Sequence, residues 1–340
     1  MRILLTADPF IPVPPGGYGG IERIVDGLAR SYRARKHAVG LVAHPASKCT
    51  VDGFFPWPDV GRQAGLLSNT LALLRAVRQF KPDIVHSFSR LAYLLPVLSL
   101  RLPKVMSYQR HTGGRQIEWS SRIARRSLRF TGCSEYICAM GRNSGGQWTS
   151  VPNFVELDKL TFVPRVEPDA PLLFLSRLES IKGPDVAIEI ARRAGRRLIL
   201  AGNRVETGPE GAFFDRQIAP KIGHDGVEWV GEVDDIRKNE LLGRAAALVV
   251  PIQWDEPFGI VFVEALATGT PVITCARGAT PEIVDPGRTG FFITDAEGGA
   301  AAVERLDQIN RYACHRTAEA RFSREACAER YLELYREMVP

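Results

Sequence analysis

The stretch DEPFGIVFVEALATGTP spans residues 255–271 and holds two glutamates, Glu256 and Glu264, one before an apolar run and one inside it. Pro257 and Gly259 mark a turn into a helix, and the glycine and proline after the run mark its end. Glu256 is therefore expected in a loop, and Glu264 more than one turn into the helix. Eight helical residues turn through about 800°, which would leave two such side chains about 80° apart. The spacing favours two separate contacts to one extended ligand over a paired acid/base dyad.

Both glutamates have a chemistry that suits such a ligand. A carboxylate accepts two hydrogen bonds at once and is a natural partner for vicinal hydroxyls. The first N–H groups of the helix, at Gly259, Ile260 and Val261, are free to hold a phosphate. The alternative is that Glu256 only favours the helix dipole and that Glu264 is solvated. However, the neighbours of Glu264 are apolar, and a carboxylate in such a helix needs a partner or a ligand.

Short β-rich runs alternate with helical patterns along the whole chain, which predicts an α/β fold with parallel sheets. The predicted strands are residues 2–7, 38–44, 83–88, 103–108, 172–177, 197–202, 227–231, 247–252, 271–275 and 290–293. The predicted helices are residues 21–34, 66–80, 185–194, 236–246, 259–267 and 324–338. A chain of 340 residues exceeds the usual size of one core, and a segment rich in proline and charge, near 153–171, reads as a linker. The sequence therefore predicts two Rossmann-like units, and we expect ligands to bind at the carboxyl ends of their strands.

Two loops at such strand ends could hold an anion. The first, PFIPVPPGGYGGIER, places Gly16, Gly17, Gly19 and Gly20 directly before a helix, where small residues let a phosphate approach the backbone. The second, FLSRLESIKGPD, places Arg177 and Lys182 where two cations could clamp a diphosphate and stabilise it as it leaves. A flexible glycine loop and ordinary surface charges are the alternatives.

Charge and composition narrow the possible partners. Residues 101–130 hold eight Lys or Arg against one acid, Glu118, which suits anionic lipid, nucleic acid or a phosphorylated substrate, or else a solvated face. The net charge of +6 says little by itself. No apolar run reaches the roughly 18 residues of a membrane span, and the first residues suit a strand better than a signal peptide. The six scattered cysteines have no metal spacing and predict free thiols in a reducing cytoplasm.

Several motifs together resemble the retaining GT-B glycosyltransferases of family 4, the glycosyl transferases group 1. EPFGIVFVE followed by ALATGTPVI is similar to the E-x7-E signature of that family. GGYGGIE, DIVHSF, VPNFVEL, SRLESIKG, VEWVGEV and PEIVDPGRTGFFI are similar to further family motifs and occur in the family's order. The resemblance covers nearly the whole chain.

The resemblance implies a GT-B fold, in which two facing Rossmann-like domains with parallel sheets enclose a donor cleft. The acceptor domain would be residues 1–155, the nucleotide-sugar donor domain 156–321, and the final helix, about 322–340, would pack back on the acceptor domain. It implies transfer of a hexosyl unit from a nucleotide sugar to a saccharide, lipid-linked or small-molecule acceptor, with retained configuration. No cofactor and no essential metal are expected, and nucleic acid is not an expected partner.

Site roles also follow from the resemblance. Arg177 and Lys182 would bind the donor diphosphate, and Gly17 with its neighbours Gly16 and Gly19 would close on it from the other domain. Glu264 would take the ribose hydroxyls.

Around the first helical turn, Glu256 would hold the donor sugar with the backbone of Phe258 and Gly259, and the amides of Ile260 and Val261 would hold the phosphate. The two glutamates would thus grip the sugar and the ribose of one donor.

One position departs from the family pattern. The family has a TxH motif at the end of a strand, but here the strand reads VMSYQRHTGG, so that Gln109 occupies the place of the histidine and His111 follows two residues later. We expect His111 to take the role, because Gly113 and Gly114 would let the loop move. Gln109 as a hydrogen-bond donor is the alternative, and His86 is as well explained as a structural residue.

Other classes are compatible with parts of the pattern. A nucleotide-sugar 2-epimerase shares the fold, and a non-catalytic nucleotide-sugar sensor would bind a donor without consuming it. A dehydrogenase is disfavoured, because GxGxxG is missing after the first strand. The segment 115–130 mixes Trp119 and Ile123 with arginines, which suits a helix on anionic membrane as well as one packed on the core. A cytoplasmic protein, peripheral at the inner face of the membrane, is the corresponding expectation.

Overall fold

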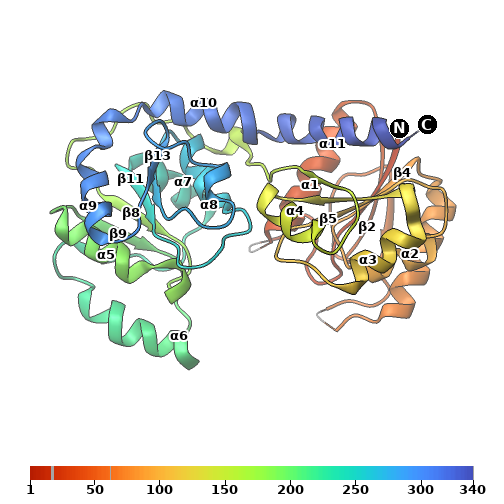
Figure 1. Cartoon of the computed structure of the whole chain (residues 1–340), viewed down its shortest axis with the longest axis horizontal. Coiled ribbons are helices and arrows are strands. Elements are labelled where there is room, and N and C mark those ends of the chain that lie inside the picture. Colours follow the sequence, from red (N-terminus) through yellow and green to blue (C-terminus); the bar gives the residue numbers. More distant parts are fainter. Residues whose placement is uncertain (17–18, 62, 340) are drawn as a thin grey trace. The chain divides into compact units, whose positions relative to one another are not determined.

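The computed structural model describes the chain except for residues 17–18, 62 and 340. The chain forms two compact units. Unit 1 comprises Met1–Asn153 and Arg324–Pro340, and unit 2 comprises Phe154–Ser323. Each unit is built on one parallel sheet and is described here by itself (Figure 1).

Unit 1 has a seven-stranded parallel sheet in the order β3-β2-β1-β4-β5-β6-β7. Its strands are β1 (Arg2–Thr6), β2 (Ala38–Ala43), β3 (Gly53–Pro56), β4 (Ile84–Ser87), β5 (Lys104–Tyr108), β6 (Leu128–Gly132) and β7 (Trp148–Ser150). Its helices are α1 (Gly20–Ala34), α2 (Leu66–Phe80), α3 (Arg115–Ala124), α4 (Glu135–Arg142) and α11 (Arg324–Met338). The direction of strand order reverses between β1 and β4, which is where doubly wound sheets bind ligands.

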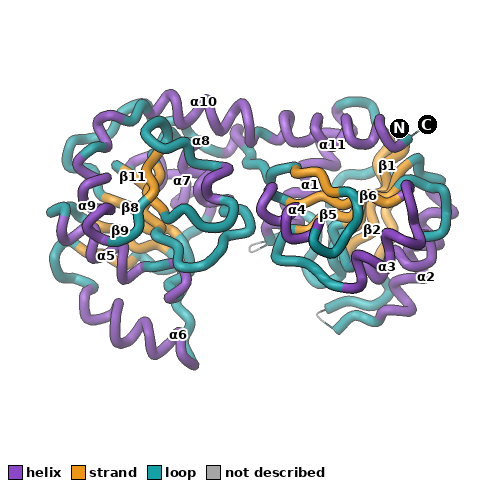
Figure 2. Tube along the Cα trace, viewed as in Figure 1, coloured by secondary structure: helices purple, strands orange, loops and turns teal. Residues whose placement is uncertain are grey.

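Unit 2 repeats this order with six parallel strands, β10-β9-β8-β11-β12-β13. The strands are β8 (Leu172–Leu175), β9 (Leu198–Ala201), β10 (Val227–Trp229), β11 (Ala247–Val250), β12 (Val272–Thr274) and β13 (Gly290–Phe292). The helices are α5 (Pro184–Arg193), α6 (Gly208–Phe213), α7 (Asp235–Arg244), α8 (Ile260–Ala267), α9 (Ala296–Glu304) and α10 (Arg311–Phe322). Figure 2 shows the strands inside a shell of helices and loops. The order reverses between β8 and β11.

All ten predicted strands are present, and the α/β parallel-sheet class is confirmed. Three strands of unit 1 were not predicted: β3, β6 and β7. They are short and lie toward the edges of the sheet, and β3 alternates between half-buried and exposed residues. The sequence pattern is weak for β3 and β7, because only one of their seven residues is fully buried. β6 was missed although four of its five residues are buried.

A buried polar network joins α11 to the sheet of unit 1. His86 of β4 is fully buried, with Nδ1 hydrogen-bonded to the hydroxyl of Tyr335 and Nε2 2.6 Å from Ser107 Oγ. The Tyr335 hydroxyl also lies 3.1 Å from that of Tyr32 on α1. Burial lowers the pKa of His86 to about 3. His86 is therefore neutral. Its hydrogen bonds within the core of unit 1 account for its burial, and no ligand is needed to explain it.

A buried arginine closes unit 2. Arg311, at the start of α10, is 8% exposed. Its guanidinium donates to the carbonyls of Val163, Gly243 and Ala245 and to Thr270 Oγ1. Burial lowers its pKa to about 10, so the group stays charged at neutral pH. These bonds tie the start of α10 to the end of α7 and to Val163, which lies in the segment before β8.

Candidate active site

Two neighbouring strands of unit 2, β8 and β11, end beside each other at the point where strand order reverses. The loop after β8 contains a short helical turn, Ser180–Lys182. Its Ile181 carbonyl accepts a hydrogen bond from Gln253 N, in the loop after β11. At Gly183 the backbone has φ 72°, and a Cβ there would lie 2.3 Å from the carbonyl oxygen of Pro251. Glycine is thus required to bring the Lys182 loop against the end of β11.

Glu210 holds the same loop from the other side. Its carboxylate accepts hydrogen bonds from Ser180 N and Ser180 Oγ, both at 2.7 Å. The turn that carries Lys182 is therefore fixed on both sides, and its lysine projects from a rigid frame.

Lys182 and Glu256 form the centre of the site. Lys182 Nζ lies 2.6 Å from Glu256 Oε2, and both side chains are largely buried. Trp254 Nε1 donates to the same oxygen at 3.0 Å, and the Trp254 ring lies under Lys182 Nζ, 4.7 Å from its centroid. One carboxylate oxygen thus receives two donors, and the ammonium group also has an aromatic face beside it.

The backbone of Glu256 is also fixed. Its carbonyl accepts a hydrogen bond from Ala279 N at 2.8 Å. Gly278, with φ 59°, packs so closely that a Cβ would lie 2.3 Å from the carbonyl oxygen of Glu256. The loop after β12 therefore supports the loop after β11, and Glu256 cannot shift without moving both.

The first turn of α8 follows Glu256 directly. Gly259 is the N-cap, and no side chain caps the helix. The N–H groups of the first turn have no intrahelical partner in an α-helix, and they form a region of positive potential. Arg177, after β8, is half exposed and pairs with Glu179. The predicted diphosphate residues thus lie at the carboxyl ends of adjacent strands.

Glu264 lies farther along α8 and does have a protein partner. Its Oε1 is 2.6 Å from Lys238 Nζ, and Asp235 lies 3.1 Å from the same nitrogen. Burial alone would lower the pKa of Lys238, but the two carboxylates outweigh it and raise the pKa. The sequence indicated that Glu264 needs a partner or a ligand. It gave no signal for Lys238, because that residue is on another helix.

Unit 1 has a cavity of about 770 Å³ at the carboxyl ends of β1, β4 and β5. The start of α1 contributes Gly19 and Glu22, and the segment after β5 contributes Gln109 and His111. Burial raises the pKa of Glu22, and the nearby Asp8 carboxylate adds to this effect. The residues that line the cavity thus include two acids, Asp8 and Glu22, the amide residue Gln109, and two cations, Arg90 and Arg110.

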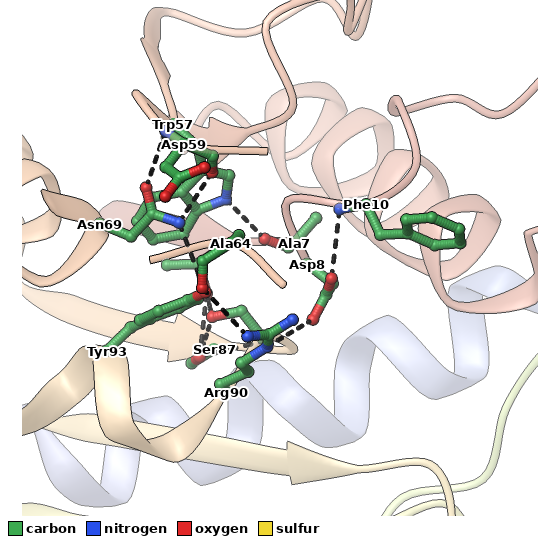
Figure 3. Close-up of polar contacts among 12 residues, drawn as sticks. Ala7, Asp8, Phe10, Trp57, Asp59, Ala64, Asn69, Ser87, Arg90 and Tyr93 are labelled. Carbon is green, nitrogen blue, oxygen red and sulfur yellow. Dashed lines mark hydrogen bonds and ion pairs between the residues drawn. The ribbon is translucent and has the colours of Figure 1, made fainter. Parts of the chain in front are cut away.

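A network of hydrogen bonds shapes one wall of this cavity (Figure 3). Asp8 Oδ1 accepts from Phe10 N at 3.2 Å, and Asp8 Oδ2 lies 3.7 Å from Arg90 Nε. Arg90 also donates to the carbonyl of Ala64. The loops after β1 and β4 are therefore linked by side chains.

The two candidates for the family histidine differ in their surroundings. His111 is exposed, and its Nε2 lies 3.4 Å from the hydroxyl of Tyr136. The amide atoms of Gln109 are buried at the cavity. Of the predicted glycine loop, Gly16 is exposed and Gly19 is buried, and Gly17 lies outside the described residues.

Two features are absent from the described part of the chain, a membrane-spanning helix and a cluster of metal ligands. No helix there is long and apolar enough to span a bilayer. Nor does that part hold a group of three or more His, Cys, Asp or Glu with the geometry of a metal site.

Comparison with known families identifies the chain. The family model of glycosyl transferases group 1 matches residues 160–321, and that of glycosyltransferase family 4 matches residues 18–159. The chain is a group 1 glycosyltransferase. A glycogen synthase of Mycobacterium tuberculosis is 28% identical, over 90% of this chain and 86% of its own length.

Solved structures give the same fold. AviGT4, a glycosyltransferase involved in avilamycin A biosynthesis, is 26% identical, covers 99% of this chain and 98% of its own, and has a TM-score of 0.72. Anabaena HepE, solved in complex with UDP-glucose, has a TM-score of 0.70 over 99% of this chain and 100% of its own. At 20% identity it shows the fold alone. The glycosyltransferase therefore has the predicted GT-B fold.

In this glycosyltransferase, the structure brings Lys182 and Glu256 into direct contact, which the resemblance did not indicate. Sequence analysis also missed Trp254. A signal was present, since a tryptophan two residues before Glu256 stands in a loop that was already a candidate.

Proposed function

We propose that the enzyme transfers a hexosyl unit from a nucleoside diphosphate sugar to an acceptor hydroxyl, with retained anomeric configuration and without an essential metal. The observation that carries the proposal is the cluster of Lys182, Glu256 and Trp254 beside the uncapped start of α8. A cation, a helix N-terminus and a fixed carboxylate at the ends of β8 and β11 suit a diphosphate joined to a sugar. The UDP-glucose bound to HepE, which has the same fold, supports a donor of this class.

Different residues contact different parts of the donor. Lys182 and Arg177 hold the diphosphate, together with the amides of Ile260 and Val261. Since Lys182 is held by Glu256 and by the Trp254 ring, its charge is already oriented before the donor binds.

The two glutamates take hydroxyl groups. Glu256, with the backbone of Phe258 and Gly259, holds the donor sugar. Glu264 accepts from the ribose hydroxyls, and Lys238 orients its carboxylate from behind.

In the reaction, the bond between the anomeric carbon and the diphosphate oxygen breaks, and a bond forms between that carbon and the acceptor oxygen. The acceptor hydroxyl releases its proton, and the nucleoside diphosphate leaves with one more negative charge on its terminal phosphate. Lys182, Arg177 and the α8 amides stabilise this charge, and we assign no carboxylate as nucleophile. Electrostatic stabilisation of this type is usually the largest contribution to the rate.

The experiment that tests the proposal is NMR of the purified protein with UDP-, GDP-, ADP- and dTDP-sugars, with and without EDTA. Release of nucleoside diphosphate from one donor, insensitive to EDTA and abolished in Lys182→Ala, is the expected result. A product whose new linkage has the donor's anomeric configuration would support retention. Appearance of a 2-epimerised sugar, or saturable binding without turnover for any acceptor, would contradict the transfer reaction.

We also propose that α3 contacts the inner, cytoplasmic face of an anionic membrane and that the acceptor is lipid-linked or polyanionic. Trp119 is 50% and Ile123 38% exposed, and the two lie one turn apart on a helix that also carries Arg115 and Arg122. Apolar and cationic side chains on one surface suit a lipid interface. Co-sedimentation with liposomes should rise with the content of anionic lipid, and binding that does not depend on this content would exclude the membrane contact.

A further inference from the structure

Unit 1 has a second hollow, separate from the cavity at the carboxyl ends of its strands. Its volume is about 600 Å³, and its lining includes Arg30, Arg33, Lys36, His37 and Asp52. These residues belong to the end of α1 and to the segments that lead into β2 and β3. The strands of the sheet pair in parallel, so their amino ends lie at the edge opposite to their carboxyl ends. This α1 hollow therefore lies at the other edge of the sheet from the unit 1 cavity.

Cations outnumber acids among the described residues that line the α1 hollow, with Arg30, Arg33 and Lys36 against Asp52. Arg30 Nε lies 3.0 Å from Asp26 Oδ2, which offsets its charge. Arg33 Nε lies 3.4 Å from Asp52 Oδ2, but the two side chains are 37% and 40% exposed, and ion pairs as exposed as this one are weak. Lys36 is exposed and forms no ion pair with a described residue. The positive charge of the hollow is thus concentrated on Arg33 and Lys36.

Lys36 occupies a backbone position that favours glycine. Its φ is 63°, in the left-handed region. His37 N donates to the Tyr32 carbonyl at 3.0 Å and Lys36 N to the Arg33 carbonyl at 2.9 Å, and this pair of bonds is the Schellman end of an α-helix. Glycine is the usual residue there, because a side chain in this conformation costs free energy. The turn itself does not need a lysine, which indicates a use for the charge, either beside the helix dipole or toward a ligand.

The side chains of the α1 hollow limit the chemistry of such a ligand. Arginine and lysine side chains donate hydrogen bonds and accept none, and those of Arg33 and Lys36 make no hydrogen bond with a described residue. A phosphate dianion accepts from both, and its oxygens match the fork of a guanidinium. Asp52 is held in place by Val39 N, which donates to Oδ2 at 2.8 Å. Its carboxylate can accept from a hydroxyl group of the same ligand.

His37 gives a second sign of positive potential in the hollow. Burial lowers its pKa, and the charges of the amino terminus, Arg336 and Arg35 lower it further, while Glu329 opposes them. The positive charges around the ring therefore outweigh the negative one, which favours an anion at this wall.

We infer that the α1 hollow binds the phosphate group of a small phosphorylated sugar or polyol, at a site separate from the candidate active site. Arg33 and Lys36 donate to the phosphate oxygens, and Asp52 accepts from a hydroxyl. A volume of about 600 Å³ is in the usual range of small-molecule sites, so the rest of the ligand has room. The inference does not depend on the proposed function, because none of these residues belongs to the proposed donor site.

The test uses NMR of the full chain and the ring signal of His37. The chain has six histidines, and the His37 signal is assigned by its loss in His37→Gln. The probes are glucose 6-phosphate, inorganic phosphate and glucose, at constant pH and at an ionic strength kept constant with sodium chloride. We expect a saturating shift with both phosphates, tighter binding of glucose 6-phosphate than of inorganic phosphate, and no shift with glucose.

Other results would contradict the inference. The absence of a saturating shift, or a shift that sodium chloride alone reproduces, would show that the charges are only screened. Loss of the shift in Lys182→Ala would show that the signal comes from the donor site of unit 2, and the hollow would not be a separate site. Equal affinity for glucose 6-phosphate and inorganic phosphate would exclude the hydroxyl contact of Asp52 and with it the sugar or polyol.

Matched variants test the lysine. Lys36→Gly removes the cation from a position that suits glycine, so the ligand-free variant should melt close to the wild type. Its dissociation constant for glucose 6-phosphate should rise about tenfold or more, the usual effect of losing a hydrogen bond to a charged group. The control is Lys81→Gly, because Lys81 ends α2 of the same unit with φ 49° and is not among the lining residues. Lys81→Gly should bind as the wild type does, and equal binding by the two variants would show that Lys36 only favours the helix dipole.

Discussion

Lys182 Nζ and Glu256 Oε2 lie 2.6 Å apart, although the two residues are separated by 74 positions in the chain. The contact joins the loops after β8 and β11, and both side chains are mostly withdrawn from solvent. The lysine that would neutralise the leaving diphosphate is therefore oriented by the glutamate that would hold the sugar.

Lys182→Ala should lower kcat by about 10²–10³-fold, the usual effect of removing one group that stabilises developing charge. The same change in the exposed Lys159 of unit 2 is the control and should leave the rate near that of the wild type. Donor hydrolysis and acceptor transfer are both measured. Turnover of Lys182→Ala within a factor of three of the wild type would contradict the role.

Trp254→Phe keeps a ring beside Lys182 but removes the donor to Glu256 Oε2. The loss of one hydrogen bond to a charged group costs about 1.5–3 kcal/mol when the bond is fully formed, so we expect kcat/KM to fall about tenfold or more. Trp254→Leu removes both contacts and should be slower still. Equal rates for Trp254→Phe and the wild type would show that the indole N–H does not orient Glu256.

Lys238→Met should destabilise unit 2 by about 1–3 kcal/mol, because the largely buried Glu264 loses its cation. The raised pKa of Lys238 in the folded state sets the pH dependence. The stabilisation is complete below the ordinary lysine pKa of about 10.4 and is lost as pH rises through the higher folded value. Urea unfolding of both proteins from pH 7 to 11 checks this, and a difference that grows with pH would be the wrong sign.

His86 gives the opposite dependence at acidic pH. Its folded pKa of about 3 lies below the 6.5 of an ordinary histidine, so the unfolded chain binds the proton more tightly. Stability should fall as pH drops below about 6.5, by about 2 kcal/mol at pH 5. His86→Gln removes this contribution, and the pH dependence of unfolding should become correspondingly weaker. An unchanged slope between pH 7 and 5 would refute the assignment.

Arg311→Met leaves the buried carbonyls of Gly243 and Ala245, and the partly buried carbonyl of Val163, without their donor. At about 1–3 kcal/mol for each unsatisfied buried group, the loss should be at least about 2 kcal/mol. Arg311 does not belong to the candidate site, so the folded variant should keep its KM for the donor at low temperature. A variant as stable as the wild type would show that water replaces the guanidinium.

The sequence by itself determined the parallel α/β class, the place of helix α8 and the family. These depend on local patterns: buried β-rich runs, helix starts such as Gly183–Pro184, and glycines where the backbone must turn. The edge strands β3 and β7 were not predicted, because they bury few residues. β6, which lies between β5 and β7 and is mostly buried, was also missed.

Only the tertiary structure decided which charged groups meet. Lys238 reaches Glu264 from another helix, and Lys182 reaches Glu256 across two strand ends, so that no spacing in the sequence marks either pair. The same holds for Gln109. Whether a glutamine amide is solvated, paired or buried without a partner depends on the loops that surround it, and the sequence alone favoured the more familiar histidine two residues away.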